Sequence, residues 1–198
     1  MSDFTSAEMM SVTAARALTN DMTCFVGIGV PSEAANLARL THAPLQTKPD
    51  VLPLSIGDGE LCESALTTVS VPEMFRYWLQ GGHVSVGFLG TAQLDRYANI
   101  NTTLIGDYLE PQVRLPGGGG APEIGTNAQE VFITVKQSKR TFVKDVDFIT
   151  TVGFGRDGKA RDNVPNIGRG PTVAPSAREL EVLRDLKART DAHHAAQQ

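Results

Sequence analysis

Short apolar segments that end in glycine turns alternate with segments of helical periodicity, and this alternation limits the folds that the chain can adopt. Helices are predicted to begin at a capping box from Thr5 to Glu8, at Pro31 and at Pro72, and a last helix is predicted over 176–194. Strands are predicted at 23–26, 51–56, 84–89, 102–105 and 131–135, with a further strand within 142–152. Strands alternating with helices favour an α/β fold, a layered sheet with helices on both faces.

The composition narrows the class of protein. The 198 residues are 41% apolar and carry 18 basic and 22 acidic side chains, for a formal net charge of −4. We expect one globular domain over residues 1–198, with no basic surface for nucleic acid. No apolar run approaches the roughly 20 residues that span a bilayer, and the N-terminus lacks the basic region of a signal peptide. The prediction is a cytoplasmic protein with no membrane partner.

A run of four glycines, Gly117 to Gly120, is the most specific local feature. Glycine loses more backbone entropy on folding than any other residue, so four in succession need a compensating reason. One interpretation is a flexible surface loop. The other is a backbone that approaches a ligand closely and directs its N–H groups at an oxyanion. The spacing alone leaves both interpretations open.

Two other turns follow predicted strands. Gly27 and Gly29 precede a helix, so they form either a tight turn or an anion site at the helix N-terminus; the third glycine of a dinucleotide fingerprint is missing. Asp58 and Glu60 follow the predicted strand over 51–56. Turns at strand ends carry the sites of many α/β proteins, although aspartate and glycine are also ordinary turn residues.

Polar residues gather in the segment 93–101, which contains Gln93, Asp95, Asn99 and Asn101. Their density predicts a shaped, hydrogen-bonded loop near a site. The remaining metal-ligand residue types give weaker signals: Cys24 and Cys62 are expected to be buried free thiols, and the pair His193–His194 is interpreted as a chance pair in a polar tail. No metal site is predicted.

Seven motifs together resemble the β subunits of family I CoA-transferases, and the likeness extends over nearly the whole chain. In order they are Gly27-Ile-Gly-Val-Pro31, Pro53-Leu-Ser-Ile-Gly-Asp-Gly-Glu60, Phe75-Arg-Tyr-Trp-Leu-Gln-Gly-Gly82, Val86-Gly-Phe-Leu-Gly90, Gln93-Leu-Asp-Arg-Tyr97, Asn99-Ile-Asn-Thr-Thr103 and Gly117-Gly-Gly-Gly-Ala-Pro122. The resemblance implies the family fold and a partner α subunit, commonly in an α2β2 heterotetramer.

The resemblance also implies an activity. In the family, a glutamate of the β subunit attacks the thioester of succinyl-CoA, and the CoA group passes through a glutamyl-CoA thioester to a 3-oxo acid. In the members most alike, the acceptor is 3-oxoadipate, an intermediate in the catabolism of aromatic hydrocarbons by the β-ketoadipate pathway. No cofactor is bound permanently, since the CoA thioester is a substrate.

The implied site is incomplete. Gly117 to Gly120 match the family loop that lines the acyl site, and Gly27, Gly29, Gln93 and Asn99 are assigned to substrate binding. The Glu-Ser-Gly turn that carries the nucleophile has no match, so a segment is predicted to be missing near 44/45. The family has further strands after the position of Val173, so a second segment is predicted to be missing near 173/174. Glu60 is the candidate substitute nucleophile. The alternative is a subunit that hydrolyses CoA thioesters or is catalytically inactive.

Overall fold

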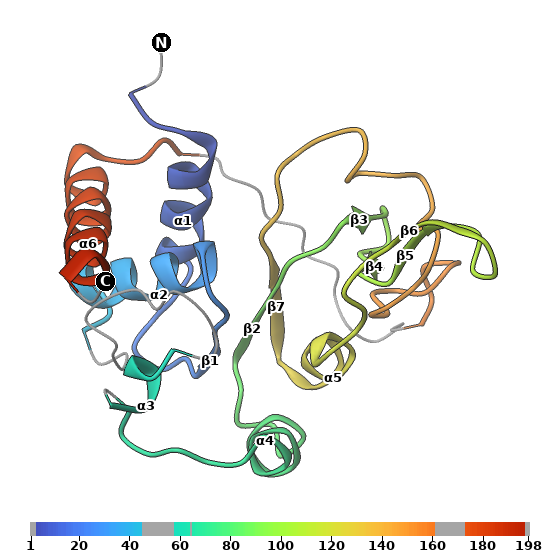
Figure 1. Cartoon of the computed structure of the whole chain (residues 1–198), viewed down its shortest axis with the longest axis horizontal. Helices are drawn as coiled ribbons and strands as arrows, with labels where there is room; N and C mark the ends of the chain where they lie inside the picture. Colours follow the sequence, from blue (N-terminus) through green and yellow to red (C-terminus); the bar gives the residue numbers. More distant parts are fainter. Residues whose placement is uncertain (1–2, 45–57, 64, 161–172, 197–198) are drawn as a thin grey trace. The chain divides into compact units, whose positions relative to one another are not determined.

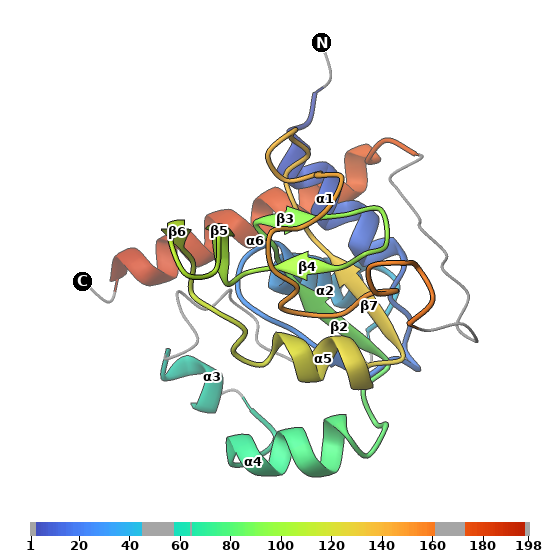
Figure 2. The same ribbon diagram turned by 90° about the vertical axis from the view of Figure 1, so that its right-hand side faces the viewer.

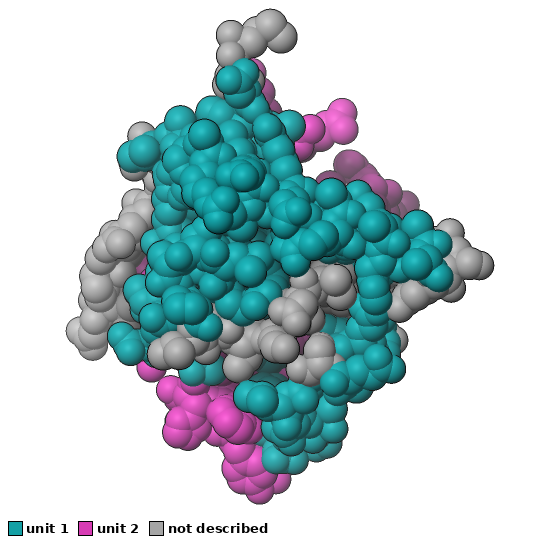
Figure 3. Space-filling model, turned by 90° about the vertical axis from the view of Figure 1, so that its left-hand side faces the viewer, with its two compact units in different colours: residues 1–74, 169–198 teal, residues 75–168 magenta. Residues whose placement is uncertain are grey.

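The computed structural model describes residues 3–44, 58–63, 65–160 and 173–196 (Figure 1). The predicted strand over 51–56 lies outside these residues. The chain forms two compact units, coloured separately in Figure 3: unit 1 comprises residues 1–74 and 169–198, and unit 2 comprises residues 75–168. The sequence predicts one domain over 1–198.

Unit 1 is built on three helices, α1 (Ser6–Arg16), α2 (Val30–Thr41) and α6 (Ala177–Ala196), which pack side by side (Figure 1). The predicted capping box is present, because the Thr5 side chain accepts from the Glu8 amide while the Glu8 carboxylate accepts from the Thr5 amide. Two short elements also belong to unit 1, β1 (Cys24–Phe25) and α3 (Glu60–Glu63). The apolar faces of the three helices form the core, with Val12, Ala15, Leu18, Ala34, Leu37, Leu183 and Leu186 at most 1% exposed.

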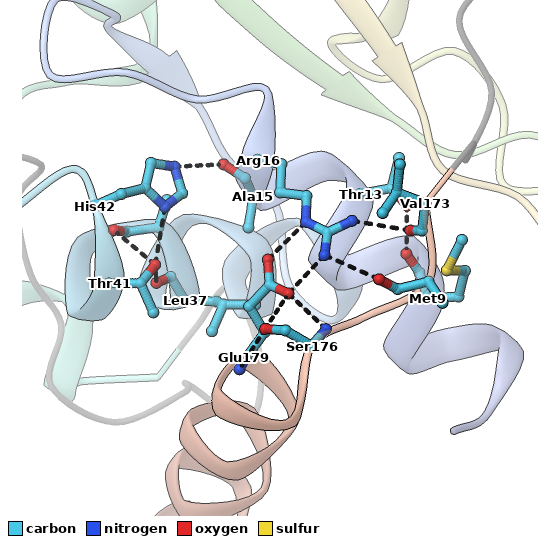
Figure 4. Close-up of polar contacts among 12 residues, drawn as sticks. Met9, Thr13, Ala15, Arg16, Leu37, Thr41, His42, Val173, Ser176 and Glu179 are labelled. Carbon is cyan, nitrogen blue, oxygen red and sulfur yellow. Dashed lines mark hydrogen bonds and ion pairs between the residues drawn. The ribbon is translucent and has the colours of Figure 1, made fainter. Parts of the chain in front are cut away.

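A charged contact fastens the start of α6 to α1 (Figure 4). The Arg16 guanidinium donates to both carboxylate oxygens of Glu179 at 2.6 Å, and it also donates to the carbonyl oxygens of Val173 and Ala174. Ser176 adds its backbone N–H and its hydroxyl to the same carboxylate. The hydrogen bonds from Arg16 are the main cause that lowers the pKa of the Glu179 carboxyl from 4.5 to about 2.

We expect Glu179→Gln to reduce the free energy of unfolding by about 1 to 2 kcal/mol at pH 7, because Arg16 loses a charged acceptor while its partial exposure screens the pair. The folded-state pKa is lower than the unfolded value, so this stabilisation is present above pH 4.5 and is lost as the pH falls to about 2. Urea unfolding between pH 7 and pH 3 measures it. The matched control is Glu181→Gln, whose partner Arg178 is 71% exposed; an equal loss in both variants would contradict the prediction.

The predicted helix at Pro72, where the chain passes from one unit to the other, has an unexpected form. A short α-helix, α4 (Val71–Glu73), continues into a π-helix, η1 (Met74–Leu79). The helix is therefore present, with a wider hydrogen-bonding pattern in its second half. Leu79 is its fully buried residue, whereas Tyr77 and Trp78 are 64% and 43% exposed.

Unit 2 is organised around two parallel strands, β2 (Val86–Leu89) and β7 (Glu130–Ile133), paired from Val86–Glu130 to Leu89–Ile133 (Figure 2). Helix α5 (Ala121–Asn127) packs on β2. Its close approach requires Gly87, because a Cβ there would lie 2.4 Å from Cγ2 of Ile124. Two antiparallel pairs complete the unit: β3 (Gln93–Leu94) with β4 (Ile100–Asn101), and β5 (Leu104–Gly106) with β6 (Pro111–Arg114).

Some local predictions were wrong. No strand forms within 142–152, where the backbone makes isolated bridges from Phe142 to Leu94 and from Thr151 to Ile100. The two cysteines are free thiols, but the prediction that they are buried was wrong, because Cys62 is exposed and Cys24 is partly exposed. Within the described residues, no helix combines the length and the apolar character that crossing a bilayer requires.

Candidate functional site

The glycine loop, Gly117 to Gly120, lies in unit 2 between β6 and α5, and its first residue is fixed from both sides. The Gly117 N–H donates to the Thr102 carbonyl at 2.8 Å, and the Thr102 hydroxyl donates back to the Gly117 carbonyl at 2.8 Å. Gly117 therefore anchors the loop, and its own N–H is already used. This narrows the predicted set of oxyanion donors to the three glycines that follow.

Each glycine of the loop has a physical reason. Gly117 and Gly119 have φ of +98° and +49°, in the region that favours glycine. A Cβ on Gly118 would lie 3.3 Å from the Pro122 ring, and a Cβ on Gly120 would lie 2.6 Å from Cζ of Phe75. These constraints are typical of a turn with a fixed conformation that packs on its neighbours. They favour the interpretation of a ligand-binding backbone over that of a flexible surface loop.

The backbone donors of Gly118, Gly119 and Gly120 have no hydrogen-bond acceptor among the described residues. The carbonyl groups of the same loop are used: Gly118 accepts from Ala121 at 2.9 Å and Gly120 from Ile124 at 3.0 Å, as α5 begins. Gly119 is exposed and Gly118 and Gly120 are partly exposed, so water or a ligand can reach their N–H groups and supply the acceptor. Three neighbouring donors on a fixed loop can hold a negatively charged oxygen.

Two threonines that the sequence did not single out brace this loop. The Thr150 hydroxyl accepts from the Thr102 N–H at 2.9 Å and lies 2.7 Å from the Thr103 hydroxyl. The backbone of Thr150 is itself fixed, because its N–H donates to the Ile100 carbonyl. Thr102 thus connects β4 to Gly117. The signal that could have identified Thr102 is its place in the Asn-Ile-Asn-Thr-Thr motif, directly after residues 93–101, which are called the polar turn below.

The polar turn contains Asn99, a predicted substrate-binding residue that is fully buried. Its side-chain N–H groups donate to the Asp95 carboxylate at 2.8 Å and to the Gly155 carbonyl at 2.9 Å. Its side-chain oxygen accepts from the N–H groups of Gly153 and Gly155. All four hydrogen-bonding positions of the amide are therefore used within the protein. Asn99 joins the turn to the segment 153–155, as the predicted hydrogen-bonded loop requires.

Gln93 is arranged in a similar way. Its side-chain oxygen accepts from the Asn101 side chain at 2.7 Å and from the Asp147 N–H at 3.0 Å, and its side-chain N–H donates to the Asp147 carboxylate. Asn101 is fully buried and Gln93 is 7% exposed. Contact of Gln93 or Asn99 with substrate stays a prediction; the structure shows both amides holding the backbone that leads to Thr102.

The other predicted site residues belong to unit 1. Gly29 caps α2 with φ of +87° and ψ of −136°, a conformation open to glycine, and its carbonyl accepts from the Ser32 hydroxyl. The tight-turn interpretation accounts for this geometry, while Gly27 has open space where a Cβ would lie. Glu60 opens α3, with its side chain 16% exposed and one carboxylate oxygen bonded to Nε2 of His193.

Comparisons with known proteins give one consistent result. The sequence model of the coenzyme A transferase family matches residues 7–184. The β subunit of the 3-oxoadipate CoA-transferase of Pseudomonas knackmussii is 47% identical over 256 aligned positions, covering 100% of this chain and 98% of the relative. The alignment has more positions than this chain has residues, so parts of the relative have no counterpart here.

Two further relatives are more distant. The crystal structure of glutaconate coenzyme A-transferase from Acidaminococcus fermentans superposes with a TM-score of 0.71 at 29% identity, covering 83% of this chain and 69% of that chain. The cholesterol ring-cleaving hydrolase IpdB subunit of Mycobacterium bovis is 30% identical over 135 residues, which is 63% of this chain and 52% of the relative.

Proposed function

Because the chain belongs to the coenzyme A transferase family, we propose that it is the β subunit of a CoA-transferase that moves CoA from succinyl-CoA to a 3-oxo acid, with 3-oxoadipate as the acceptor. The observation that carries the proposal is the 47% identity, along the whole chain, to a relative that is the β subunit of an enzyme named for that acceptor. The proposed assembly is an α2β2 heterotetramer in the cytoplasm, with no permanently bound cofactor.

The glycine loop has a defined part in this reaction. A carboxylate attacks the thioester carbonyl and expels CoA thiolate, which leaves a mixed anhydride. The thiolate then attacks the enzyme-side carbonyl, forming an enzyme–CoA thioester and releasing succinate; the acceptor acid takes CoA by the same two steps in reverse. Each attack places negative charge on a carbonyl oxygen. The N–H groups of Gly118, Gly119 and Gly120, which have no acceptor among the described residues, would hold that oxygen.

The nucleophile itself is proposed to belong to a segment missing near 44/45, with a second missing segment near 173/174. The alignment to the Pseudomonas relative, which is longer than this chain, supports missing segments. Glu60 is the remaining carboxylate candidate within the chain. Its bond to His193 argues against this role, because the bonded carboxylate oxygen is already engaged and is less available to attack a thioester.

A second candidate function is CoA-thioester hydrolysis without the glutamyl intermediate. Similarity to a relative named as a hydrolase component favours it. In that reaction a water activated by a base of the partner α chain would replace the carboxylate, and the glycine loop would hold the same oxyanion. A third candidate, a non-catalytic subunit, would use the loop for assembly alone.

The test is to trap the covalent intermediate. The complete subunit, which carries the segment missing near 44/45, is assembled with its α subunit, incubated with succinyl-CoA and treated with borohydride or hydroxylamine, and each of the two chains is weighed by mass spectrometry. A mass change confined to this chain, together with CoA transfer to 3-oxoadipate, is the expected result. CoA release without an acceptor acid would favour the hydrolase. If the chain bound the α subunit tightly but gave neither a mass change nor CoA release, the non-catalytic role would remain. Glu60→Gln decides whether Glu60 carries the intermediate.

A further inference from the structure

A mixed cluster of carboxylates and histidines lies in unit 1. One ligand atom each of Asp58, Glu60 and His194 lie within 4.8 Å of one another. His193, the neighbour of His194, contacts the Glu60 carboxylate through Nε2. The last turns of α6 thus meet the start of α3, and the prediction that the two histidines form a chance pair in a polar tail is wrong in its geometry.

His194 is the informative member of the cluster. It is 8% exposed, although it stands near the end of a mostly polar helix, and its buried Nε2 has no hydrogen-bond partner among the described residues. Burying an imidazole nitrogen without a partner is unfavourable, and such atoms in folded proteins call for an explanation. A ligand that accepts the nitrogen lone pair would remove the penalty.

We propose that Asp58, Glu60 and His194 bind a divalent transition-metal ion, with Zn²⁺ as the best match. Zinc takes imidazole nitrogen and carboxylate oxygen together, usually four ligands in all. Calcium and magnesium require six or more oxygen ligands or retained waters, and they do not favour a buried imidazole. Three protein ligands leave a fourth position for water.

His193 has a distinct part in the proposed site. Carboxylates that bind metals are usually held by a second hydrogen bond, and the loss of such a partner weakens metal binding about 10- to 100-fold. The contact of His193 with Glu60 has this form. Because Glu60 and His194 are far apart in the sequence but close in space, the ion would fasten α3 to the end of α6, and metal binding would stabilise the fold.

The proposal is tested with the full-length chain, alone and assembled with its α subunit. After removal of metal with a chelator, Zn²⁺ is titrated by calorimetry and bound metal is counted by elemental analysis. We expect one Zn²⁺ per chain and a rise in melting temperature that grows with Zn²⁺ concentration. Co²⁺ in place of Zn²⁺ gives an independent readout, since its visible absorption reports a nitrogen- and oxygen-ligated site.

Four variants separate the ligands from their surroundings. His194→Ala and Glu60→Gln are expected to weaken Zn²⁺ binding at least about 100-fold, and His193→Ala about 10- to 100-fold. Glu63→Gln, an exposed carboxylate of the same helix α3, is the matched control and keeps wild-type affinity. Circular dichroism of the metal-free proteins verifies that each variant is folded, and Glu60→Gln decides the matter if His194→Ala does not fold.

The result that overturns the proposal is a folded wild-type chain that binds no stoichiometric Zn²⁺, or one whose affinity is unchanged in both His194→Ala and Glu60→Gln. Neither result bears on a transfer reaction whose nucleophile lies in the missing segment, because the trapping experiment measures a carboxylate-linked intermediate and needs no metal. Failure of the trapping experiment likewise leaves the metal titration interpretable.

Discussion

Asn99→Asp is expected to lower the free energy of unfolding by about 3 to 5 kcal/mol at pH 7, because it breaks a buried polar network and adds an unpaired charge. The new carboxylate oxygen would stand where Nδ2 now donates to Asp95 at 2.8 Å and to the Gly155 carbonyl at 2.9 Å. Two carboxylates at this distance repel each other, and Asp95 is only 8% exposed, so solvent screens little of the repulsion.

The chain supplies a matched control. Asn127 also donates from its side chain to a carboxylate and a carbonyl, those of Glu123 at 3.0 and 2.9 Å, but on the exposed face of α5. Asn127→Asp makes the same chemical change in solvent, and we expect a loss below about 1 kcal/mol. Urea unfolding of both variants measures the difference. Similar losses in the two would show that the burial of the Asn99 network has no energetic consequence.

This comparison also decides between two roles for Asn99. If the amide bound substrate directly and had no structural role, Asn99→Asp would change the KM while leaving the unfolding curve in place. If Asn99 instead holds the segment 153–155 against the polar turn, Asn99→Asp lowers the free energy of unfolding. The geometry supports the second role, because the backbone of Gly153 packs closely against the turn that contains Asn99. A Cβ on Gly153 would lie only 2.3 Å from the Tyr97 carbonyl oxygen.

Elements with local signals were predicted well. The capping box at Thr5, the proline in the first turn of α2 and the periodicity of the last helix each identify a helix from neighbouring residues alone, and all three helices are confirmed. The family match confirms the resemblance read from the seven motifs, and the likeness to glutaconate coenzyme A-transferase confirms the α/β fold class.

The elements that were missed depend on distant partners. Gln93–Leu94 is a strand because Ile100–Asn101 pairs with it, and the backbone near Phe142 and Thr151 makes bridges to those same two strands. Helix α5 is seven residues long and contains Gly125, so its periodicity is too short to separate from a loop. Such pairings carry no composition or period of their own.

In the candidate site, too, the features with a local sequence signal were predicted and those that depend on distant residues were not. The glycine run is visible in the sequence, but its anchor Thr102 and the brace Thr150 are 15 and 33 residues away from Gly117, and no spacing rule joins them. The sequence predicts that His194 lies in a polar tail, because its neighbours along the helix are polar. His194 is buried because of how the end of α6 packs within unit 1, and this packing cannot be predicted from the sequence of α6 alone.

Gly119→Pro is expected to reduce thioester turnover about 10²- to 10³-fold while association with the α subunit is retained. Proline removes the N–H proposed to hold the oxyanion, and its fixed φ near −65° conflicts with the φ of +49° at this position. The measurement is the rate of CoA transfer, or of CoA release, from succinyl-CoA by the assembled enzyme. Both reactions pass through a thioester oxyanion, so the prediction applies to the transferase and to the hydrolase.

Gly119→Ala separates loss of the donor from insertion of a side chain. Alanine keeps the N–H, has open space at its Cβ, and tolerates the left-handed conformation at roughly 1 to 2 kcal/mol. We expect this variant to lose some stability but to stay within about tenfold of wild-type turnover, with kcat for Gly119→Pro far below it. If the proline and alanine variants turned over at the same rate, the N–H of Gly119 would have no part in stabilising the transition state, and the loop would serve the fold alone.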